Sequence, residues 1–383
     1  MRALLNFTNF GAMLFSDVIN NAYKPREYPA LALLADQWMR TRPFSGLKIL
    51  AATPIFRNTL LQYRALLAGG AQLFVGRAQG DDGSATMPCD KKIVSLLQEF
   101  GIPVISDRDV KDGSVADDFD LILDCAGQFS FCHPRKGFVE LTRSGVQFYE
   151  ASERPVYVAD SGIVKRIETT LGTGDGYFRA LEQLGHGDFE GKKLVVFGSG
   201  KVGCGIALQG VRRGFRVTTV TDTANRNSGT DFTRVLENND VEIVSHLDED
   251  GVREAVERCD YLVTATGVKG ALSMAVANIL NQNRHIVAAN MGVEDEFGTL
   301  VPRFRVLNRK APLNFILEEP THLKYIDASL GLHAALGERL LQDISRGERF
   351  MGPRDPASDL EQKLLMATIQ NGEIGMEVCD MLR

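Results

Sequence analysis

Short apolar runs alternate with helical patterns through the first half of the chain. Such alternation predicts a mostly parallel sheet with helices on both faces. A helical pattern around residues 31–38 precedes it, and the first half contains no phosphate-binding glycine motif. We therefore expect this half to be a substrate domain. Its predicted strands cover 47–52, 71–75, 103–105 and 120–124, and its predicted helices cover 58–68 and 91–100.

The second half is organised around a glycine-rich turn that follows the apolar run 194–197. A helical pattern over 206–213 and a strand pattern over 216–220 come next. The order strand, Gly-x-Gly-x-x-Gly, helix, strand is what a dinucleotide-binding fingerprint requires. The alternative is a glycine-rich turn that binds nothing. Strands predicted at 241–244, 261–264 and 286–289, with helices at 251–258 and 272–280, complete a Rossmann unit.

Each glycine of the motif has its own expected role. Gly198 permits the tight turn, Gly200 lets the backbone approach a pyrophosphate, and Gly203 lets helix and strand pack closely. The pyrophosphate is expected at the helix N-terminus, because free N–H groups and the helix dipole favour an anion there. The predicted cofactor-binding residues of this segment are Gly198, Ser199, Gly200, Lys201, Val202 and Gly203.

The patterns together predict an α/β protein with two doubly wound domains, an N-terminal substrate domain and a Rossmann NAD-binding domain, followed by a C-terminal helical return segment. A helical pattern at 170–184 connects the two domains, the chain becomes helical again over 325–342, and 360–369 is the last amphipathic helix. The expected domains are 1–172 plus 320–347 for the substrate domain, 173–319 for the Rossmann domain and 348–383 for a C-terminal extension.

Composition narrows the class of protein. With 383 residues, 44% hydrophobic and 24% charged, the chain resembles ordinary globular enzymes, and its net charge of −6 argues against a nucleic-acid-binding surface. No apolar run reaches the roughly 18–20 residues of a membrane span. The 6 cysteines show no metal-binding spacing. We therefore expect a cytoplasmic protein without a metal site, and a homodimer or homotetramer.

Polar residues and glycines follow the strands of the Rossmann unit, where parallel strands contact ligands. Asp222, about 20 residues past the glycines, is expected to hold the adenosine ribose of NAD. Alternatively, Thr221 with Arg226 would accommodate the 2′-phosphate of NADP, and Asp222 would be only a turn residue. The next two strand ends are expected to contact the ribose or the nicotinamide through Thr264, Ala265, Thr266, Gly267, Asn290, Met291 and Gly292.

These motifs resemble those of the adenosylhomocysteinase (S-adenosylhomocysteine hydrolase) family over about residues 31–342. The resemblance implies a substrate domain, an NAD-binding domain and a return of the chain to the first. It also implies a reaction that begins when NAD oxidises a ribose 3′-hydroxyl; the ketone acidifies the neighbouring C–H, a thiol leaves, water adds and the ketone is reduced. Thr169 and Asn314 join the expected cofactor contacts. The matched motifs are Gly-x-Gly-x-Val-Gly-x-Gly at 198–205, Thr-x-Thr-Gly at 264–267, Asn-Ile-Gly at 290–292 and Asp-Ser at 160–161.

The departures from the family remove its acid/base groups. Its catalytic Lys falls on Val164, an aspartate falls on Gln128, and a histidine beside the nicotinamide falls on Val293. Its His-Met-Thr becomes 54–56, and its Glu-Glu-Thr-Thr-Thr-Gly segment survives at best at 150–152. Proton abstraction beside a carbonyl needs a positioned base, and these replacements remove the family's candidates for that role. We therefore expect that the nucleotide-binding scaffold is kept, whereas the substrate site has been rebuilt. The expected substrate contacts are Thr53, Phe56, Asn58 and Gln128.

Four residues are candidates for acid/base catalysis. Glu168 conservatively replaces a family aspartate. Lys165 is adjacent to the position of the family's lysine, although Lys165 and Arg166 could simply form a solvated basic face. Glu150 is the second candidate carboxylate, and its alternative role is that of a helix cap. His322 lies within one residue of a family histidine.

The sequence thus predicts an NAD-dependent enzyme, with NADP as the less favoured cofactor. It would oxidise or reduce a hydroxyl or carbonyl carbon of a small polar or nucleoside-like substrate in the cleft between the domains. One alternative is a non-catalytic NAD-binding paralogue that regulates or scaffolds a partner. The other is a genuine adenosylhomocysteine hydrolase with a rebuilt site.

Overall fold

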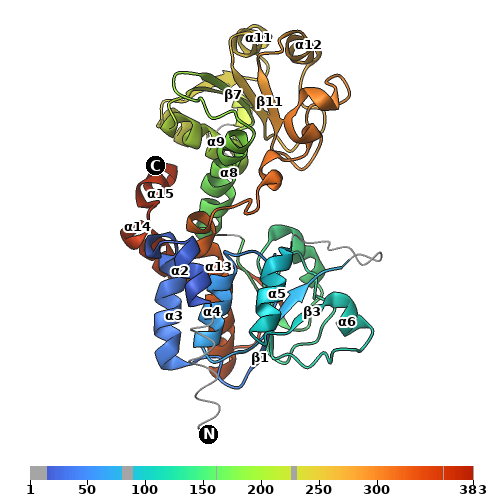
Figure 1. The fold of residues 1–383 in the computed structure, drawn as a ribbon, viewed down its shortest axis with the longest axis vertical. Coiled ribbons are helices and arrows are strands. Elements are labelled where there is room, and N and C mark those ends of the chain that lie inside the picture. The colour runs from blue at the N-terminus through green and yellow to red at the C-terminus, as the bar shows by residue number, and fades with distance from the viewer. Residues whose placement is uncertain (1–14, 80–88, 161, 226–230, 357, 383) are drawn as a thin grey trace. The chain divides into compact units, whose positions relative to one another are not determined.

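The computed structural model describes residues 15–79, 89–160, 162–225, 231–356 and 358–382, and it divides the chain into two compact units (Figure 1). Unit 1 consists of Met1–Lys165 and Ile326–Glu373, and unit 2 of Arg166–Tyr325 and Ile374–Arg383. The expected extension over 348–383 is therefore not one body. Its first part belongs to unit 1 and its last residues to unit 2.

Unit 1 is built on a parallel seven-stranded sheet with the order β12-β6-β5-β4-β1-β2-β3. The four strands predicted in the first half of the chain correspond to β1, β2, β3 and β4. β5, β6 and β12 were not predicted, because each begins with a turn-type residue, Gly137, Pro155 or Gly352. The strands are β1 (Lys48–Ala51), β2 (Gln72–Arg77), β3 (Val104–Ser106), β4 (Leu121–Asp124), β5 (Gly137–Glu140), β6 (Pro155–Val158) and β12 (Gly352–Arg354).

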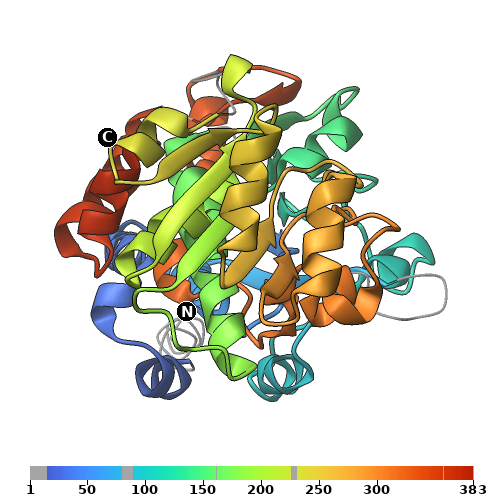
Figure 2. The same cartoon turned by 90° about the horizontal axis from the view of Figure 1, so that it is seen from above.

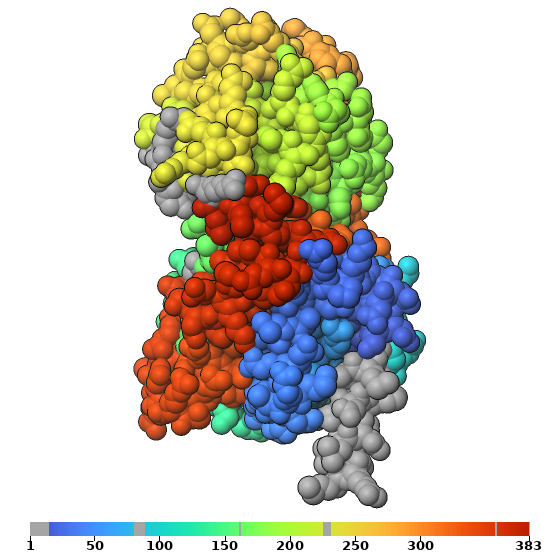
Figure 3. Space-filling model, turned by 90° about the vertical axis from the view of Figure 1, so that its left-hand side faces the viewer, coloured from blue at the N-terminus to red at the C-terminus, as the bar shows by residue number. Residues whose placement is uncertain are grey.

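Helices of unit 1 pack beside one another next to this sheet. α3 lies along α4 (Figure 1), and α14 lies on α3 at the surface (Figure 3). Asp327 of α13 caps α3, because its carboxylate accepts the N–H groups of Ala30 at 2.7 Å and Leu31 at 3.0 Å. The helices are α2 (Ser16–Ala22), α3 (Pro29–Thr41), α4 (Leu60–Ala68), α5 (Lys91–Glu99), α6 (Asp107–Lys111), α7 (Ile163–Arg166), α13 (Leu323–Ser345, which begins in unit 2) and α14 (Ser358–Asn371).

Unit 2 is built on a parallel five-stranded sheet with the order β11-β10-β7-β8-β9. Helices α11 and α12 lie over one face of the sheet (Figure 2), and α9 packs against β7 and β8. Its elements are the π-helix η3 (Ile167–Gly172), α8 (Thr173–Gln183), β7 (Lys193–Phe197), α9 (Lys201–Arg212), β8 (Arg216–Thr221), α10 (Thr233–Glu237), β9 (Glu242–Ser245), α11 (Glu249–Glu257), β10 (Tyr261–Thr264), α12 (Met274–Gln282), β11 (Val287–Asn290) and α15 (Gly375–Leu382).

The α/β fold class with two parallel sheets is confirmed, and two helix boundaries are corrected. α9 begins at Lys201 rather than at 206, because the glycine motif itself continues into the helix. The helix predicted at 360–369 is α14, but it is not the last one, since α15 follows it and belongs to unit 2. No helix in the described part of the chain combines the length and apolar character needed to span a membrane.

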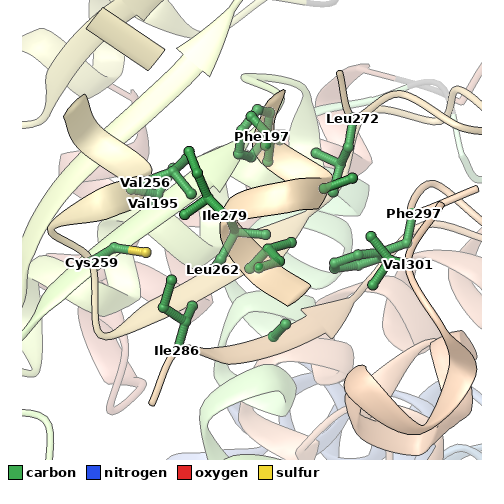
Figure 4. Close-up of a cluster of buried hydrophobic side chains, with 14 of the residues drawn as sticks. Val195, Phe197, Val256, Cys259, Leu262, Leu272, Ile279, Ile286, Phe297 and Val301 are labelled. Carbon is green, nitrogen blue, oxygen red and sulfur yellow. The ribbon is translucent and has the colours of Figure 1, made fainter. Parts of the chain in front are cut away.

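The core of unit 2 lies between its sheet and α11 and α12 (Figure 4). Val195 of β7, Leu262 of β10 and Ile279 of α12 belong to the same buried cluster. Burying a side chain of this size contributes about 1.5–3 kcal/mol. The apolar run that precedes the glycine turn is therefore fixed from one side by this core, and α9 lies on the other side.

Candidate functional site

A pocket of about 900 Å³ lies at the carboxyl ends of β7, β8 and β10 in unit 2. This is where an open α/β sheet binds its ligands. Asp231, His246 and the start of α12 also line the pocket. The predicted cofactor contacts that line it are Gly198, Ser199, Gly200, Thr221, Asp222, Ala265 and Thr266.

Two glycines of the motif are required by the backbone. Gly198 has a φ of +106°, and a Cβ atom there would lie closer to the Ala265 carbonyl than the 3.0 Å that real Cβ atoms keep. A Cβ atom on Gly203 would overlap the Gly198 carbonyl in the same way. The first N–H groups of α9 have no partner inside the helix and follow this turn directly. The turn thus provides the close backbone approach and the donors that a dinucleotide pyrophosphate needs.

Two carboxylates line the β8 side of the pocket. Asp222 follows β8, and its Oδ1 accepts the Ala224 N–H at 2.9 Å. Asp231 was not predicted, because it lies nine residues after Asp222 in the sequence and outside the strand pattern. Ser199 holds this region through a 2.7 Å hydrogen bond between its hydroxyl and that of Thr221. Arg226, the residue of the NADP alternative, lies outside the described residues.

Thr264 and Asn290 are placed differently from the prediction. Both side chains are fully buried, and the Thr264 hydroxyl donates to Asn290 Oδ1 at 3.0 Å. Asn290 Nδ2 donates to the carbonyls of Gly292, Glu294 and Lys310. These side chains therefore join the ends of β10 and β11 and do not line the pocket. The other predicted residues outside the pocket lining are Lys201, Val202, Gly203, Gly267, Met291, Gly292, Asn314 and Thr169.

Glu296 is a buried residue that the sequence did not single out. Its carboxylate accepts the N–H groups of Thr266 at 2.8 Å and Gly267 at 2.7 Å, and the Thr266 hydroxyl at 2.9 Å. A Cβ atom on Gly292 would overlap this carboxylate. Gly292 thus leaves the room that the Glu296 carboxylate needs.

Unit 1 holds a second polar arrangement, in the turn after β4. Asp124 accepts the N–H groups of Cys125 at 2.8 Å and Phe129 at 2.9 Å, and the Tyr149 hydroxyl at 2.5 Å. Burial and, next, the neighbouring Glu140 raise the pKa of Asp124 to about 7. Glu140, also fully buried, accepts further N–H groups of the turn, from Ala126 at 2.9 Å and Gly127 at 3.0 Å.

This turn carries Gln128, one of the predicted substrate contacts. Its Oε1 atom is buried and has no hydrogen-bond partner among the residues that the structure describes. Thr53 and Asn58 follow β1 and are almost fully buried, whereas Phe56 is half-buried. The four residues thus follow β1 and β4, which are neighbours in the sheet.

The predicted acid/base residues are divided between the two units, with Glu150 and Lys165 in unit 1 and Glu168 and His322 in unit 2. Lys165 is the last residue of unit 1 and is 4% exposed, so it is not part of a solvated basic face. Glu168 and Thr169 are half-buried on η3, and this π-helix packs against α9. His322 is half-buried just before α13, and Asn314 is buried on the short 3-10 helix Leu313–Ile316.

Comparison with known proteins supports the family resemblance. The adenosylhomocysteinase of Thermoplasma acidophilum is 23% identical, with 85% of this chain and 86% of the relative covered. That of Thermotoga maritima is 26% identical over 76% of this chain and 72% of the relative. The chain is thus similar to the adenosylhomocysteinases at low identity over most of its length, as a divergent family member would be. The S-inosyl-L-homocysteine hydrolase of Methanocaldococcus jannaschii is 22% identical, with 93% and 91% covered. No protein-family model matches the chain.

Similar solved structures share the fold only loosely. The dipicolinate synthase structure from Bacillus halodurans superposes with a TM-score of 0.46 at 14% identity, covering 77% of this chain and 97% of that one. A similarity of this size supports no argument about the site.

The segment Glu-Glu-Thr-Thr-Thr-Gly of the family resemblance, predicted to survive at best at 150–152, has a second partial match at 140–145. Glu150 is exposed at the end of the 3-10 helix Arg143–Tyr149. The segment 140–145, Glu-Leu-Thr-Arg-Ser-Gly, keeps the family's first Glu, a Thr and the closing Gly. Glu140 is the last residue of β5 and pairs in register with Asp124 of β4. The signal missed in the sequence was the short apolar strand that ends at Glu140.

Proposed function

We propose that the protein is an NAD-dependent enzyme that oxidises or reduces a hydroxyl or carbonyl carbon of a small polar or nucleoside-like substrate. The observation that carries this proposal is the pocket of unit 2, where a glycine turn without room for side chains meets the start of α9. The other residues of the pocket leave the backbone of this glycine turn accessible. The turn lies at the carboxyl end of β7, and sheets of this kind typically bind dinucleotides at that end of their strands.

The residues present fit NAD. The N–H groups at the start of α9 would bind the pyrophosphate, and Asp222 would accept hydrogen bonds from the adenosine ribose hydroxyls. NAD would supply hydride acceptance from a carbon that bears a hydroxyl group. Asp222 and Asp231 place two carboxylates in the same pocket, so a 2′-phosphate would be repelled there. This favours NAD over NADP.

The relatives suggest the substrate class. Their names describe hydrolases of adenosyl- and inosyl-homocysteine, so a nucleoside-like substrate is a reasonable expectation for this chain. Glu168 would act as the acid/base group for the substrate hydroxyl, because it conservatively replaces a family carboxylate. The groups replaced at Pro54, Val164 and Val293 speak against complete hydrolysis.

A non-catalytic NAD-binding protein is the second candidate, and the same three replacements favour it. Such a protein would keep the pocket of unit 2 while its bound NAD stayed oxidised. A genuine hydrolase would instead release homocysteine thiol from adenosylhomocysteine or inosylhomocysteine.

Titration calorimetry with NAD and NADP tests the cofactor. We expect NAD to bind at least about tenfold more tightly, and Asp222→Asn to reduce this preference, since removing one charge weakens the repulsion of a 2′-phosphate. A preference for NADP, or no binding of either dinucleotide, would contradict the proposal.

The absorbance of reduced nicotinamide tests the reaction. Purified protein with NAD is mixed with a panel of nucleosides, thioether nucleosides and small hydroxy acids, alongside Glu168→Gln. We expect at least one nucleoside-like compound to reduce the NAD. In Glu168→Gln we expect the rate of this reduction to fall about 100-fold at unchanged NAD affinity, because general acid/base groups contribute about that much to the rate. NAD that stays oxidised with every compound supports the non-catalytic candidate.

A further inference from the structure

Glu296 lies behind the pocket and is not part of the dinucleotide fingerprint. It follows β11 and is fully buried. Its two oxygens accept three hydrogen bonds from Thr266 and Gly267, in the turn that follows β10. Hydrogen bonds to an ionised acceptor are about twice as strong as neutral ones. The buried carboxylate therefore fixes the conformation of this turn.

The same turn forms part of the pocket wall. Ala265 and Thr266 line the pocket, and the Ala265 carbonyl lies where a Cβ atom of Gly198 would have to be. The turn is thus held between the glycine turn on one side and Glu296 on the other. A displacement of Glu296 would move Thr266 relative to the glycine turn.

Two neighbouring residues keep Glu296 in place. Gly292 has no side chain where the carboxylate lies, since a Cβ atom there would overlap Oε1. Asn290 donates to the carbonyls of Gly292 and Glu294 and so holds the segment between β11 and Glu296. The segment that the family resemblance assigned to the cofactor therefore supports a carboxylate instead.

We propose that Glu296 is a positioning residue of the cofactor pocket, which fixes the turn 265–267 for the nicotinamide half of NAD. This rests on the proposed function. β10 lies on the opposite side of β7 from β8. Asp222, expected to hold the adenosine ribose, follows β8, so the turn after β10 serves the other half of a dinucleotide that crosses the glycine turn.

Calorimetry with NAD and with 5′-AMP, which lacks the nicotinamide half, tests this assignment. In Glu296→Gln an amide donor replaces one acceptor and faces the N–H groups of the turn. We expect about tenfold weaker NAD binding, the equivalent of one charge-assisted hydrogen bond, and 5′-AMP binding within about twofold of the unaltered protein. Glu294→Gln makes the same chemical change at an exposed residue and is the matched control.

Gly292→Ala provides a second, independent variant, because it keeps the charge of Glu296 but displaces it. We expect the same selective loss of NAD binding. The inference is overturned if both variants bind NAD as Glu294→Gln does, or if NAD and 5′-AMP weaken equally, since the turn would then act only on pocket folding. If the unaltered protein binds no NAD, the proposed function is overturned and this inference with it.

Discussion

In both units, a buried glutamate holds the turn at one strand end in the same way. In each, a buried glutamate accepts two backbone N–H groups from the turn after the neighbouring strand, together with a threonine hydroxyl. In unit 1 this is Glu140, and in unit 2 it is Glu296. A glycine leaves room for each carboxylate, Gly145 in unit 1 and Gly292 in unit 2.

The neighbours of the two glutamates differ. Glu140 shares its site with the carboxyl group of Asp124, whose pKa is raised to about 7 by burial and then by Glu140. In unit 2 the residue at the matching strand end is Thr264, which pairs in register with Asn290 as Asp124 does with Glu140. Thr264 donates its hydroxyl to the neutral amide of Asn290, whose nitrogen donates to three carbonyls. The second carboxyl, with its raised pKa, makes the strand end of unit 1 sensitive to pH.

Asn290→Asp brings a second carboxyl into the strand end of unit 2, as unit 1 has, and is expected to have the largest effect. A carboxylate oxygen would face three carbonyl oxygens and add a buried charge. Unbalanced buried charges cost about 3–5 kcal/mol. Far-UV circular dichroism should show earlier melting of unit 2. The chain has 1 tryptophan, Trp38 in unit 1, so an unchanged Trp38 fluorescence transition is the control. Equal melting of the two proteins would contradict the comparison.

Gly145→Ala is expected to destabilise unit 1 by about 3 kcal/mol. Its Cβ atom would lie 2.5 Å from both carboxylate oxygens of Glu140. The carboxylate would have to move away, and the N–H groups of the turn would lose their hydrogen-bond acceptor. Urea unfolding followed by Trp38 fluorescence measures this loss. Gly331→Ala is the matched control, because its Cβ atom would meet nothing closer than 3.5 Å, and this variant should be as stable as the unaltered protein or up to about 1 kcal/mol more stable.

Asp124→Asn tests the pH dependence directly. The folded pKa of Asp124 is about 7, above the unfolded value of about 3.9, so the protonated form stabilises the fold. That contribution is complete below the unfolded pKa and is lost as the pH rises through 7. Between pH 5 and 8 we expect unit 1 of the unaltered protein to lose about 3 kcal/mol more than the variant does, since about two units of this range lie below the folded pKa, at about 1.4 kcal/mol per unit.

Trp38 fluorescence in urea at each pH gives this difference. Asp327, whose pKa is also raised to about 7 by burial, is present in both proteins, so the difference between them isolates Asp124. Parallel pH profiles would show that Asp124 does not titrate in this range.

The two threonine hydroxyls provide the smallest test. Thr142→Val removes a 2.6 Å hydrogen bond to Glu140, and Thr266→Val removes a 2.9 Å bond to Glu296. Each should cost about 1–1.5 kcal/mol of unfolding free energy. Thr142 should cost more, because its hydroxyl also accepts the N–H groups of Ala126 and Gly145. A larger loss for Thr266→Val, measured by calorimetric melting of both variants, would contradict this order.

The sequence predicted those features that depend on residues close together along the chain. The glycine turn, its strand and the strand of Asp222 follow from apolar runs and glycine spacing within a short segment. Glu296 could not be found in this way, because its partner Thr266 lies 30 residues away, and Ala126 lies 14 residues from Glu140. In sequence each glutamate resembles an ordinary loop or strand-end residue. Only the packing of neighbouring strands reveals what it bonds.

The structure gives the cofactor contacts implied by the family resemblance different surroundings. Ala265 and Thr266 line the pocket, whereas the Asn290 side chain is fully buried. The resemblance was aligned at Glu150, and the same motif has a second partial match that begins at Glu140. The short strand β5 has too few residues for its periodicity to distinguish the two alignments.

The interleaved order of the two units has a consequence for synthesis. Unit 1 needs Ile326–Glu373 and unit 2 needs Ile374–Arg383, so neither is complete when its first segment leaves the ribosome. Segments are made at roughly 5–20 residues per second, so the sheet of unit 1 would wait on the order of ten seconds for β12. During that time its β6 edge lacks its final partner. The nascent chain therefore has a period in which an exposed strand edge needs protection from other chains.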